Sequence, residues 1–177
     1  MIVPNAFNQD KHISILLPEQ PGFVLQQVRS QNAADLQQHC WPTYKLSVIT
    51  ELLNRIERMH NREHGLGLIV FHHPSKSVVG YGQVVRWGQK GEISDLVIAE
   101  PYRGQGIGTQ LILQLLHYAE GIELSYAEIN VVASNEAAHR LYNRLGFEDA
   151  YSMLLNLGHG PEKIIHMRQK LASHAPE

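Results

Sequence analysis

The sequence predicts an α/β protein of the α+β kind, with a central mixed, mostly antiparallel sheet of about six to seven strands flanked by about four helices. Three observations support this class. The chain has 177 residues, the usual size of one domain. Its hydrophobic fraction of 44% and charged fraction of 18% are ordinary for a globular protein. Strand-like and helical apolar patterns alternate along it without repeats, so we expect a single domain.

The expected domain covers residues 23–171. Residues 1–22 carry three prolines and are expected to form an N-terminal extension, in which residues 13–17 can pair as an edge strand. Residues 172–177 are expected to form a C-terminal tail.

The apolar patterns predict the elements of the domain in order. In the first half they predict a strand at 23–28, a short helix at 33–39 capped by Asn32, a helix from residue 46 that ends before Gly65, and strands at 66–71, 78–87 and 92–98. In the second half they predict a helix from residue 107 that Gly121 stops, a strand at 128–132, a helix through Leu145 closed by a left-handed Gly146, and strands at 147–155 and 163–170.

Charge and cysteine content exclude several classes of protein. The net charge of -2 provides no general attraction to nucleic acid or anionic lipid, so any phosphate must be held locally. The single cysteine, Cys40, excludes an internal disulfide and multi-cysteine metal sites and fits a reducing compartment. Residues 1–10 lack the features of a signal peptide, and no stretch approaches about 18 apolar residues. We therefore expect a soluble, cytoplasmic protein without membrane or nucleic-acid partners.

A glycine-rich turn lies between a predicted strand and a predicted helix. It reads Arg103-Gly104-Gln105-Gly106-Ile107-Gly108. The first N–H groups of a helix have no partner within the helix and attract anions, and glycines let a phosphate approach. A P-loop is excluded because Thr109-Gln110 follows, where Lys-Ser/Thr is required. A dinucleotide fingerprint is weak because Thr109 replaces its third glycine. Binding of an acyl-coenzyme A is the third interpretation, and it is the one that a family resemblance supports.

Two motifs resemble one family. Residues 100–108 resemble the Arg/Gln-x-x-Gly-x-Gly/Ala signature of the GNAT (Gcn5-related) N-acetyltransferases, and residues 135–147 resemble their Asn-x-x-Ala-x-x-x-Tyr-x-x-x-Gly-Phe stretch. The resemblance is specific over residues 92–147, whereas residues 23–87 agree only in element order. It implies a GNAT-like single domain that transfers the acetyl group of acetyl-CoA to a primary amine by direct attack in a ternary complex. The acceptor would be a small molecule or a peptide, and the protein a monomer or homodimer.

The resemblance also implies the cofactor site. The pyrophosphate would bind the backbone N–H groups of residues 104–109, and the pantetheine arm would pair with the backbone of residues 96–98. Asn135 would contact that arm, or would simply cap its helix. Tyr142 would protonate the leaving thiolate; its alternative role is that of a core tyrosine. The expected cofactor-binding residues are Leu96, Val97, Ile98, Arg103, Gly104, Gln105, Gly106, Ile107, Gly108, Thr109, Asn135 and Tyr142.

The proton acceptor and the amine site are less determined. Glu92 aligns with the catalytic glutamate of some family members, Asp95 is the second candidate if a bulge reverses its face, and a water chain is the third. The amine would bind among residues 40–44, the second helix and residues 151–159. The candidates for lining it are Trp41, Tyr44, Tyr151 and Met153, which are equally compatible with the core, and His72 or His159.

Two rival functions remain open. One is a non-catalytic acyl-CoA-binding module. The other is a zinc peptidase, because His60-Asn61-Arg62-Glu63-His64 matches a His-x-x-Glu-His pattern. Gly65 should end that helix at once and no third ligand is apparent, so a solvated helix end is favoured and no metal is expected. An acyl-carrying role for Cys40 is disfavoured because no motif pairs it with a histidine.

Overall fold

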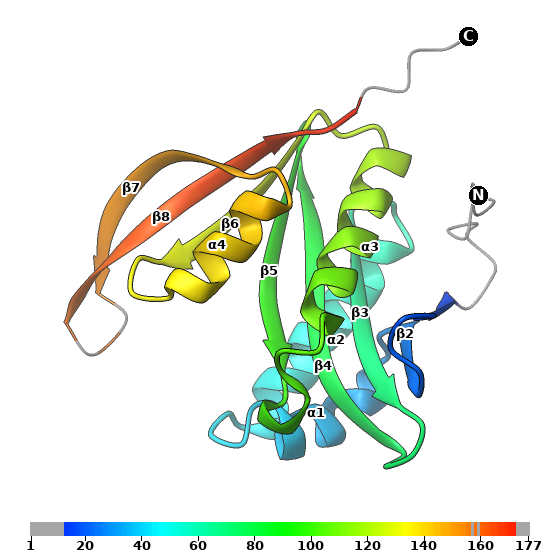
Figure 1. The fold of residues 1–177 in the computed structure, drawn as a ribbon. Helices are drawn as coiled ribbons and strands as arrows, with labels where there is room; N and C mark the ends of the chain where they lie inside the picture. Colours follow the sequence, from blue (N-terminus) through cyan, green and yellow to red (C-terminus); the bar gives the residue numbers. More distant parts are fainter. Residues whose placement is uncertain (1–12, 157, 159, 173–177) are drawn as a thin grey trace, which may run out of the picture.

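The computed structural model describes residues 13–156, 158 and 160–172, which form one eight-stranded sheet with helices on both faces (Figure 1). The strand order is β1-β2-β3-β4-β5-β6-β8-β7. The strands are β1 (Ser14–Leu16), β2 (Phe23–Gln27), β3 (Gly65–His72), β4 (Ser77–Trp87), β5 (Lys90–Ile98), β6 (Tyr126–Val132), β7 (Glu148–Asn156) and β8 (Pro161–Lys170). The helices are α1 (Ala33–His39), α2 (Leu46–His60), α3 (Ile107–Gly121) and α4 (Glu136–Arg144). The predicted class is confirmed, and the sheet has eight strands instead of six to seven because the edge strand expected within residues 13–17 is present as β1.

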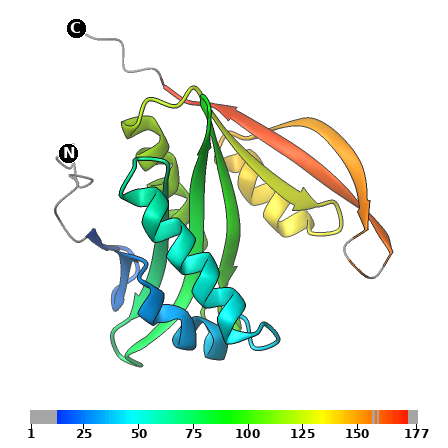
Figure 2. The ribbon, with the colours of Figure 1, turned by 180° about the vertical axis from the view of Figure 1, so that it is seen from behind.

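The helices divide between the two faces. In the view of Figure 1, α3 and α4 lie in front of the sheet, α3 on its central strands and α4 on β6 and β8. Figure 2 shows α1 and α2 on the opposite face, where they cover the central strands. No helix of the described chain covers that face of β6, β8 and β7 (Figure 2). The projecting β7–β8 half therefore has one face open to solvent.

Two apolar clusters correspond to these layers. Leu36, Ile49, Leu53 and Ile56 of α1 and α2 pack with strand residues such as Tyr81, and all five are almost fully buried. The larger cluster lies under α3 and α4 and contains Leu111, Leu115, Ala119, Ile129, Tyr142, Phe147 and Met167. Ile13 and Leu17 from the predicted N-terminal extension belong to this larger cluster. The division into extension, domain and tail stays a prediction, and residues 1–12 and 173–177 lie outside the described residues.

The sheet splits between β5 and β6, its one parallel pair within the described chain. The pairing runs only from Lys90↔Tyr126 to Ile93↔Ile129. Beyond this point β5 stays paired with β4 as far as Ile98, and β6 stays paired with β8 as far as Val132. The two halves of the sheet therefore separate from Ser94 onward, and a wedge-shaped opening forms between β5 and β6 (Figure 1).

The predicted glycine cap of α4 is confirmed. Gly146 has a φ of 94°, Gly146 N donates to Asn143 O at 3.1 Å and Phe147 N donates to Tyr142 O at 3.0 Å. This pair of hydrogen bonds is the Schellman arrangement, which satisfies carbonyls left open at the helix end. Because Phe147 is 1% exposed, the cap also fixes the C-terminal end of α4 on the core.

Asn32 acts differently from its prediction. It occupies the position before α1, but its Oδ1 accepts a 2.7 Å hydrogen bond from Arg29 N and none from the helix. It thereby closes a 3-10 turn, Ser30–Asn32, that leads directly into α1. The Asn32 Oδ1 that would otherwise cap the helix therefore accepts its hydrogen bond from the preceding turn.

Among the described residues, no helix is both long enough and apolar enough to span a bilayer.

Candidate active site

The turn before α3 presents a continuous row of unpaired backbone donors. Among the described residues, none of the six N–H groups from Gly104 to Thr109 donates a hydrogen bond, and Gln110 N is the first to do so, to Gly106 O. Gly104 and Gly106 have φ values of 73° and 80°, which L side chains rarely adopt. A Cβ at Gly106 would also lie 3.1 Å from Gln20 Nε2. The glycines therefore shape a cradle of donors at the positive end of a 15-residue helix, which suits an anion.

Arg103 connects this cradle to β5. Its Nε donates a 2.8 Å hydrogen bond to the carbonyl oxygen of Ile98, the last residue of the strand. The guanidinium is exposed and held beside the cradle, where its charge adds to that of the helix end. The carbonyl oxygen of Ile98, in the segment predicted to pair with pantetheine, therefore holds Arg103 in position.

The β6-facing edge of β5 is open where the two strands have separated. Leu96, Val97 and Ile98 belong to β5 and lie beyond its last pairing with β6 at Ile93. Their side chains are half-buried. An open edge of this kind pairs readily with an extended amide-containing chain, as an added strand does.

Helix α4 contributes Asn135 and Tyr142 from the other half of the sheet. Asn135 is the N-cap, and its Oδ1 accepts a 3.1 Å hydrogen bond from Ala138 N. Tyr142 is 8% exposed, its ring lies 6.2 Å from that of Phe147, and its hydroxyl has no hydrogen-bond partner among the described residues. Burial raises the pKa of Tyr142 above its ordinary value of 10. The phenol is therefore protonated at neutral pH and has a proton to donate.

A bulge interrupts β5 where the wedge opens. Tyr81 pairs with Val97 and Gln83 with Ser94, so Gly82 faces two residues, Asp95 and Leu96. Asp95 has a φ of 54°, in the left-handed region that aspartate tolerates better than most residues. The bulge on which the candidacy of Asp95 as a base depended is present, and the exposed Asp95 side chain lines a pocket with α2 and the connection before it.

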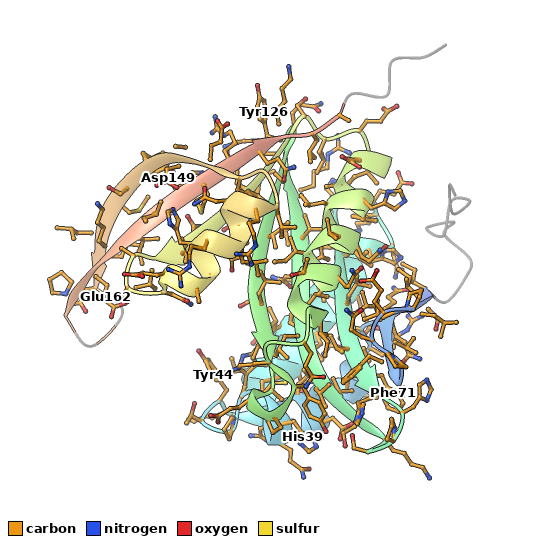
Figure 3. All side chains as sticks on the ribbon, in the orientation of Figure 1. His39, Tyr44, Phe71, Tyr126, Asp149 and Glu162 are labelled. Carbon is orange, nitrogen blue, oxygen red and sulfur yellow. The ribbon has the colours of Figure 1, made fainter. Side chains whose placement is uncertain are left out.

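Asp95 lines a small apolar pocket at this bulge. The pocket has a volume of about 250 Å³, and its walls come from the α1–α2 connection, α2 and β5. It is lined by Trp41, Tyr44, Val48, Ile49, Leu52, Asp95 and Leu96. Figure 3 shows Tyr44 on the α1–α2 connection, at the end of the sheet where β5 and β6 are separated.

The other residues expected around the amine lie elsewhere. Tyr151 and Met153 are on β7, where Tyr151 stacks on His166 with ring centroids 4.5 Å apart. His72 stacks on Phe23 at 4.6 Å, and its Nδ1 lies 2.7 Å from Ser75 Oγ, so it belongs to the β3–β4 hairpin. His159 lies outside the described residues. Of the four predicted aromatic and apolar candidates, the structure brings together Trp41 and Tyr44.

Glu92, the first candidate for the base, precedes the wedge. It is half-buried in the paired part of β5, directly across from Glu128 of β6. Glu128 is 7% exposed and is surrounded by Arg168 Nη2 at 2.7 Å, Lys90 Nζ at 3.2 Å and His166 Nε2 at 3.5 Å. Burial opposes its ionisation, but these neighbours outweigh burial and lower the pKa of Glu128. Sequence reasoning missed this cluster because its members come from three strands that are far apart in the chain.

Cys40 is poorly suited to carry an acyl group. It is half-buried and packs against both apolar clusters. Burial raises the pKa of its thiol to about 11, more than the Ala99 backbone and the Arg103 charge lower it. The thiolate, which is the nucleophile, is therefore scarce near neutrality.

The His60–His64 pattern does not form the geometry of a zinc site. Helix α2 ends at His60, and Glu63 lies beyond it with a φ of 55°. The Nδ1 of His64 contacts Arg62 O at 2.6 Å, while the ring of His60 packs near Tyr118. The two imidazoles therefore do not share a helical face. Within the described part of the chain, no three His, Cys, Asp or Glu side chains are grouped as a metal would require.

Comparison with known proteins agrees with this geometry. Residues 31–147 match the Acetyltransferase (GNAT) family, so the chain belongs to that family, as its two motifs predicted. An uncharacterised N-acetyltransferase of Methanocaldococcus jannaschii is 33% identical over 102 residues, which cover 56% of this chain and 64% of the relative. The uncharacterised N-acetyltransferase YycN of Bacillus subtilis is 30% identical over 107 residues, or 58% and 65%. The chain thus spans less than two thirds of the length of the curated relatives it matches.

Solved structures show the same fold. The ribosomal-protein-S18-alanine N-acetyltransferase of Escherichia coli superposes with a TM-score of 0.70 at 18% identity, covering 88% of this chain and 97% of that one. The ribosomal-protein-S5-alanine acetyltransferase of Vibrio fischeri gives 0.77 at 14% identity, covering 93% and 100%. The protein yncA of Salmonella typhimurium, solved with its cofactor acetyl-CoA, gives 0.71 at 17% identity, covering 88% and 97%. At these identities the likeness establishes the fold alone.

Proposed function

We propose that this protein transfers the acetyl group of acetyl-CoA to a primary amine by direct attack within a ternary complex. The observation that carries the proposal is the row of six unpaired N–H groups at the start of α3, which suits a pyrophosphate. The open edge of β5 leads to this row, and the pantetheine amides of acetyl-CoA match such an edge. The residues present therefore fit the proposed donor.

Each residue has a defined task in this proposal. The N–H groups of residues 104–109, with Arg103 beside them, bind the pyrophosphate. The backbone of residues 96–98 aligns the pantetheine arm, and Asn135 borders it from α4. Acetyl-CoA supplies the activated acetyl group. Tyr142 holds the proton that the departing sulfur requires.

The proton balance follows from the groups present. The amine nitrogen attacks the thioester carbonyl, a C–N bond forms and the C–S bond breaks. The sulfur takes the phenolic proton of Tyr142, which is feasible because the reference pKa values of a thiol and of tyrosine are about 8.5 and 10. An ammonium acceptor loses two protons as it becomes an amide. One leaves to Glu92, the predicted base, to Asp95 or to water before the attack, and the other replaces the proton that Tyr142 gives to the sulfur. Cys40 takes no part, and its replacement by alanine should leave transfer intact.

The proposal is tested by release of free thiol from acetyl-CoA in the presence of an amine panel. The panel comprises arylalkylamines, polyamines, aminoglycosides, amino acids and peptides with free N-termini or lysines. Amine-dependent thiol release and an acetylated product are expected. Tight coenzyme A binding without release by any of these amines would contradict the proposal and favour the non-catalytic acyl-CoA-binding module. The cytoplasmic location and the monomeric or homodimeric state stay predictions.

A further inference from the structure

The pocket at the β5 bulge combines apolar and aromatic side chains with one carboxylate. Six of its seven lining residues are apolar or aromatic, and Asp95 is the one charged side chain among them. Trp41 and Tyr44 stand side by side with ring centroids 6.2 Å apart. Aromatic faces and a carboxylate both attract a cation, and the aromatic faces also accept an apolar group.

The Asp95 carboxylate is held in place by a buried relay. The Tyr81 hydroxyl donates to Gln83 Oε1 at 2.8 Å, which turns Gln83 Nε2 toward Asp95 Oδ2, also at 2.8 Å. Tyr81 and Gln83 are 0% and 2% exposed. Ser94 Oγ donates to the same Asp95 oxygen at 3.2 Å. Because both bonds reach Oδ2, Oδ1 accepts none from the described residues and can receive a ligand.

The same relay reaches the aromatic wall. The Trp41 ring packs edge-on against Tyr81 at 5.5 Å. One buried tyrosine therefore supports both the aromatic wall and, through Gln83, the carboxylate. The carboxylate is thus positioned by β4 and β5, and the Trp41 ring on the α1–α2 connection packs against the same buried tyrosine.

The position of Asp95 links this pocket to the proposed reaction. The bulge lies where β5 parts from β6, and the next residues, 96–98, are those proposed to align the pantetheine arm. An amine bound to Asp95 Oδ1 therefore lies beside the donor strand, with its substituent among the aromatic and apolar side chains.

We propose that the acceptor is a monocation whose ammonium group is attached to a compact aromatic or aliphatic group, with Asp95 as its anchor. This inference rests on the proposed function. A polyamine or aminoglycoside carries several positive charges and would leave all but one without a carboxylate in this pocket. The volume of about 250 Å³ lies below the usual range of about 300–1,000 Å³ for small-molecule sites, so it accommodates one side-chain-sized group.

Two sources provide this chemistry, a free arylalkylamine and the hydrophobic N-terminal residue of a peptide. Three acceptors distinguish these two sources from each other and from a polyamine: 2-phenylethylamine, a tripeptide amide with an N-terminal phenylalanine, and spermidine. Binding of each is measured by titration calorimetry on the coenzyme A-bound protein, and transfer is measured by thiol release. We expect 2-phenylethylamine or the tripeptide to exceed spermidine at least tenfold in both affinity and kcat/KM, and the better of the two identifies the source.

Substitutions at Asp95 and Tyr44 that are compatible with the fold test the proposed ammonium anchor. Asp95→Asn keeps the shape and tolerates the left-handed backbone, and Asp95→Gly relieves that backbone while also removing the carboxylate. Both should raise the acceptor KM at least tenfold while kcat changes less. Tyr44→Ser, at a residue that is 56% exposed, should raise KM for 2-phenylethylamine several-fold. Unchanged KM in both Asp95 variants would overturn the assignment of the anchor.

Addition of a second carboxylate to the pocket provides an independent test of the monocation preference. Val48 is 52% exposed and lines the pocket, so Val48→Glu adds a second carboxylate to it. The preference for 2-phenylethylamine over spermidine should fall at least fivefold. Ser47→Glu places the same charge on the neighbouring residue outside the pocket and should leave the preference unchanged.

The outcomes separate this inference from the proposed function. Preferential transfer to spermidine by the unaltered protein would overturn the monocation inference while the acetyltransferase stands. Binding of 2-phenylethylamine that depends on Asp95, without thiol release, would support the pocket and contradict the transferase.

Discussion

The Nε of Arg103 donates a 2.8 Å hydrogen bond to the carbonyl oxygen of Ile98. This bond joins the turn that is proposed to bind pyrophosphate to the strand that is proposed to align pantetheine. The two parts of the proposed donor site are therefore linked directly by one side chain.

Arg103→Lys keeps the charge but loses the planar donor that reaches Ile98. We expect the KM for acetyl-CoA to rise about tenfold, equivalent to about 1.4 kcal/mol. The matched measurement uses acetyl-pantetheine, which lacks the pyrophosphate and should show a smaller change. An equal loss with both donors would mean that Arg103 acts on the strand alone.

Gly106→Ala introduces a Cβ at a φ of 80° and 3.1 Å from Gln20 Nε2. The left-handed backbone alone costs about 1–2 kcal/mol, so the free energy of unfolding should fall by that amount and coenzyme A affinity should drop at least tenfold. Denaturant melts and calorimetric titration measure the two effects. Gly121→Ala, at the end of the same helix and with open space around its Cβ, should instead be neutral or slightly stabilising.

Tyr142→Phe removes the proposed proton donor while keeping the buried ring. We expect kcat to fall by about 10²–10⁴, the usual contribution of a general acid, with coenzyme A affinity within about threefold of the original. Tyr118→Phe is the matched control, because this buried tyrosine donates to Gly65 O on β3 and has no proposed part in the reaction. It should lower stability by about 1 kcal/mol and leave kcat unchanged.

Glu92→Gln tests the predicted base. If Glu92 takes the proton, kcat/KM at neutral pH should fall about 10²-fold or more. The loss should shrink as pH rises toward about 10, because the free amine then forms without assistance. Activity equal to that of the parent across this range would exclude Glu92 and leave Asp95 or water.

Glu128→Gln tests the buried charge cluster through stability. Its removal leaves Arg168 and Lys90 without their shared partner, and the loss should be about 2 kcal/mol at neutral pH, less than for a fully buried pair because both cations are partly exposed. Since the pKa of Glu128 is lower in the folded protein than its ordinary 4.5, its contribution is complete above that value and is lost as pH falls through the folded pKa.

Urea melts of the parent and of Glu128→Gln should therefore differ by a constant amount between about pH 6 and 8 and should converge in acid. Arg140→Gln removes an exposed ion pair with Glu136 and should change stability by no more than a few tenths of a kcal/mol. A stability difference between the parent and Glu128→Gln that grows as the pH falls would contradict the lowered pKa of Glu128.

Features set by neighbouring residues were predictable from the sequence. The glycine turn before α3 and the Gly146 cap depend on backbone conformations that glycine allows, and the structure contains both. The apolar spacing predicted α2 because that pattern is local, although the helix ends at His60 and not at Gly65, which begins β3.

Features set by cross-strand register were not predictable in this way. The left-handed Asp95 depends on how β5 aligns with β4, and its partner Gln83 lies 12 residues earlier. Glu128 and Arg168 are 40 residues apart and meet only because β6 pairs with β8. The His60–His64 spacing suggested a shared helical face, but the helix ends at the first of them.

The short β5–β6 pairing has a thermodynamic consequence. Among the described residues, strand pairing between the two halves of the sheet is limited to 90–93 and 126–129, so a molecule that pairs with the open edge of β5 and also touches α4 would bridge both halves. By mass action, a donor present at 100 times its dissociation constant would add about 2.7 kcal/mol to the free energy of unfolding. The melting temperature of this protein should therefore rise with the concentration of the proposed donor.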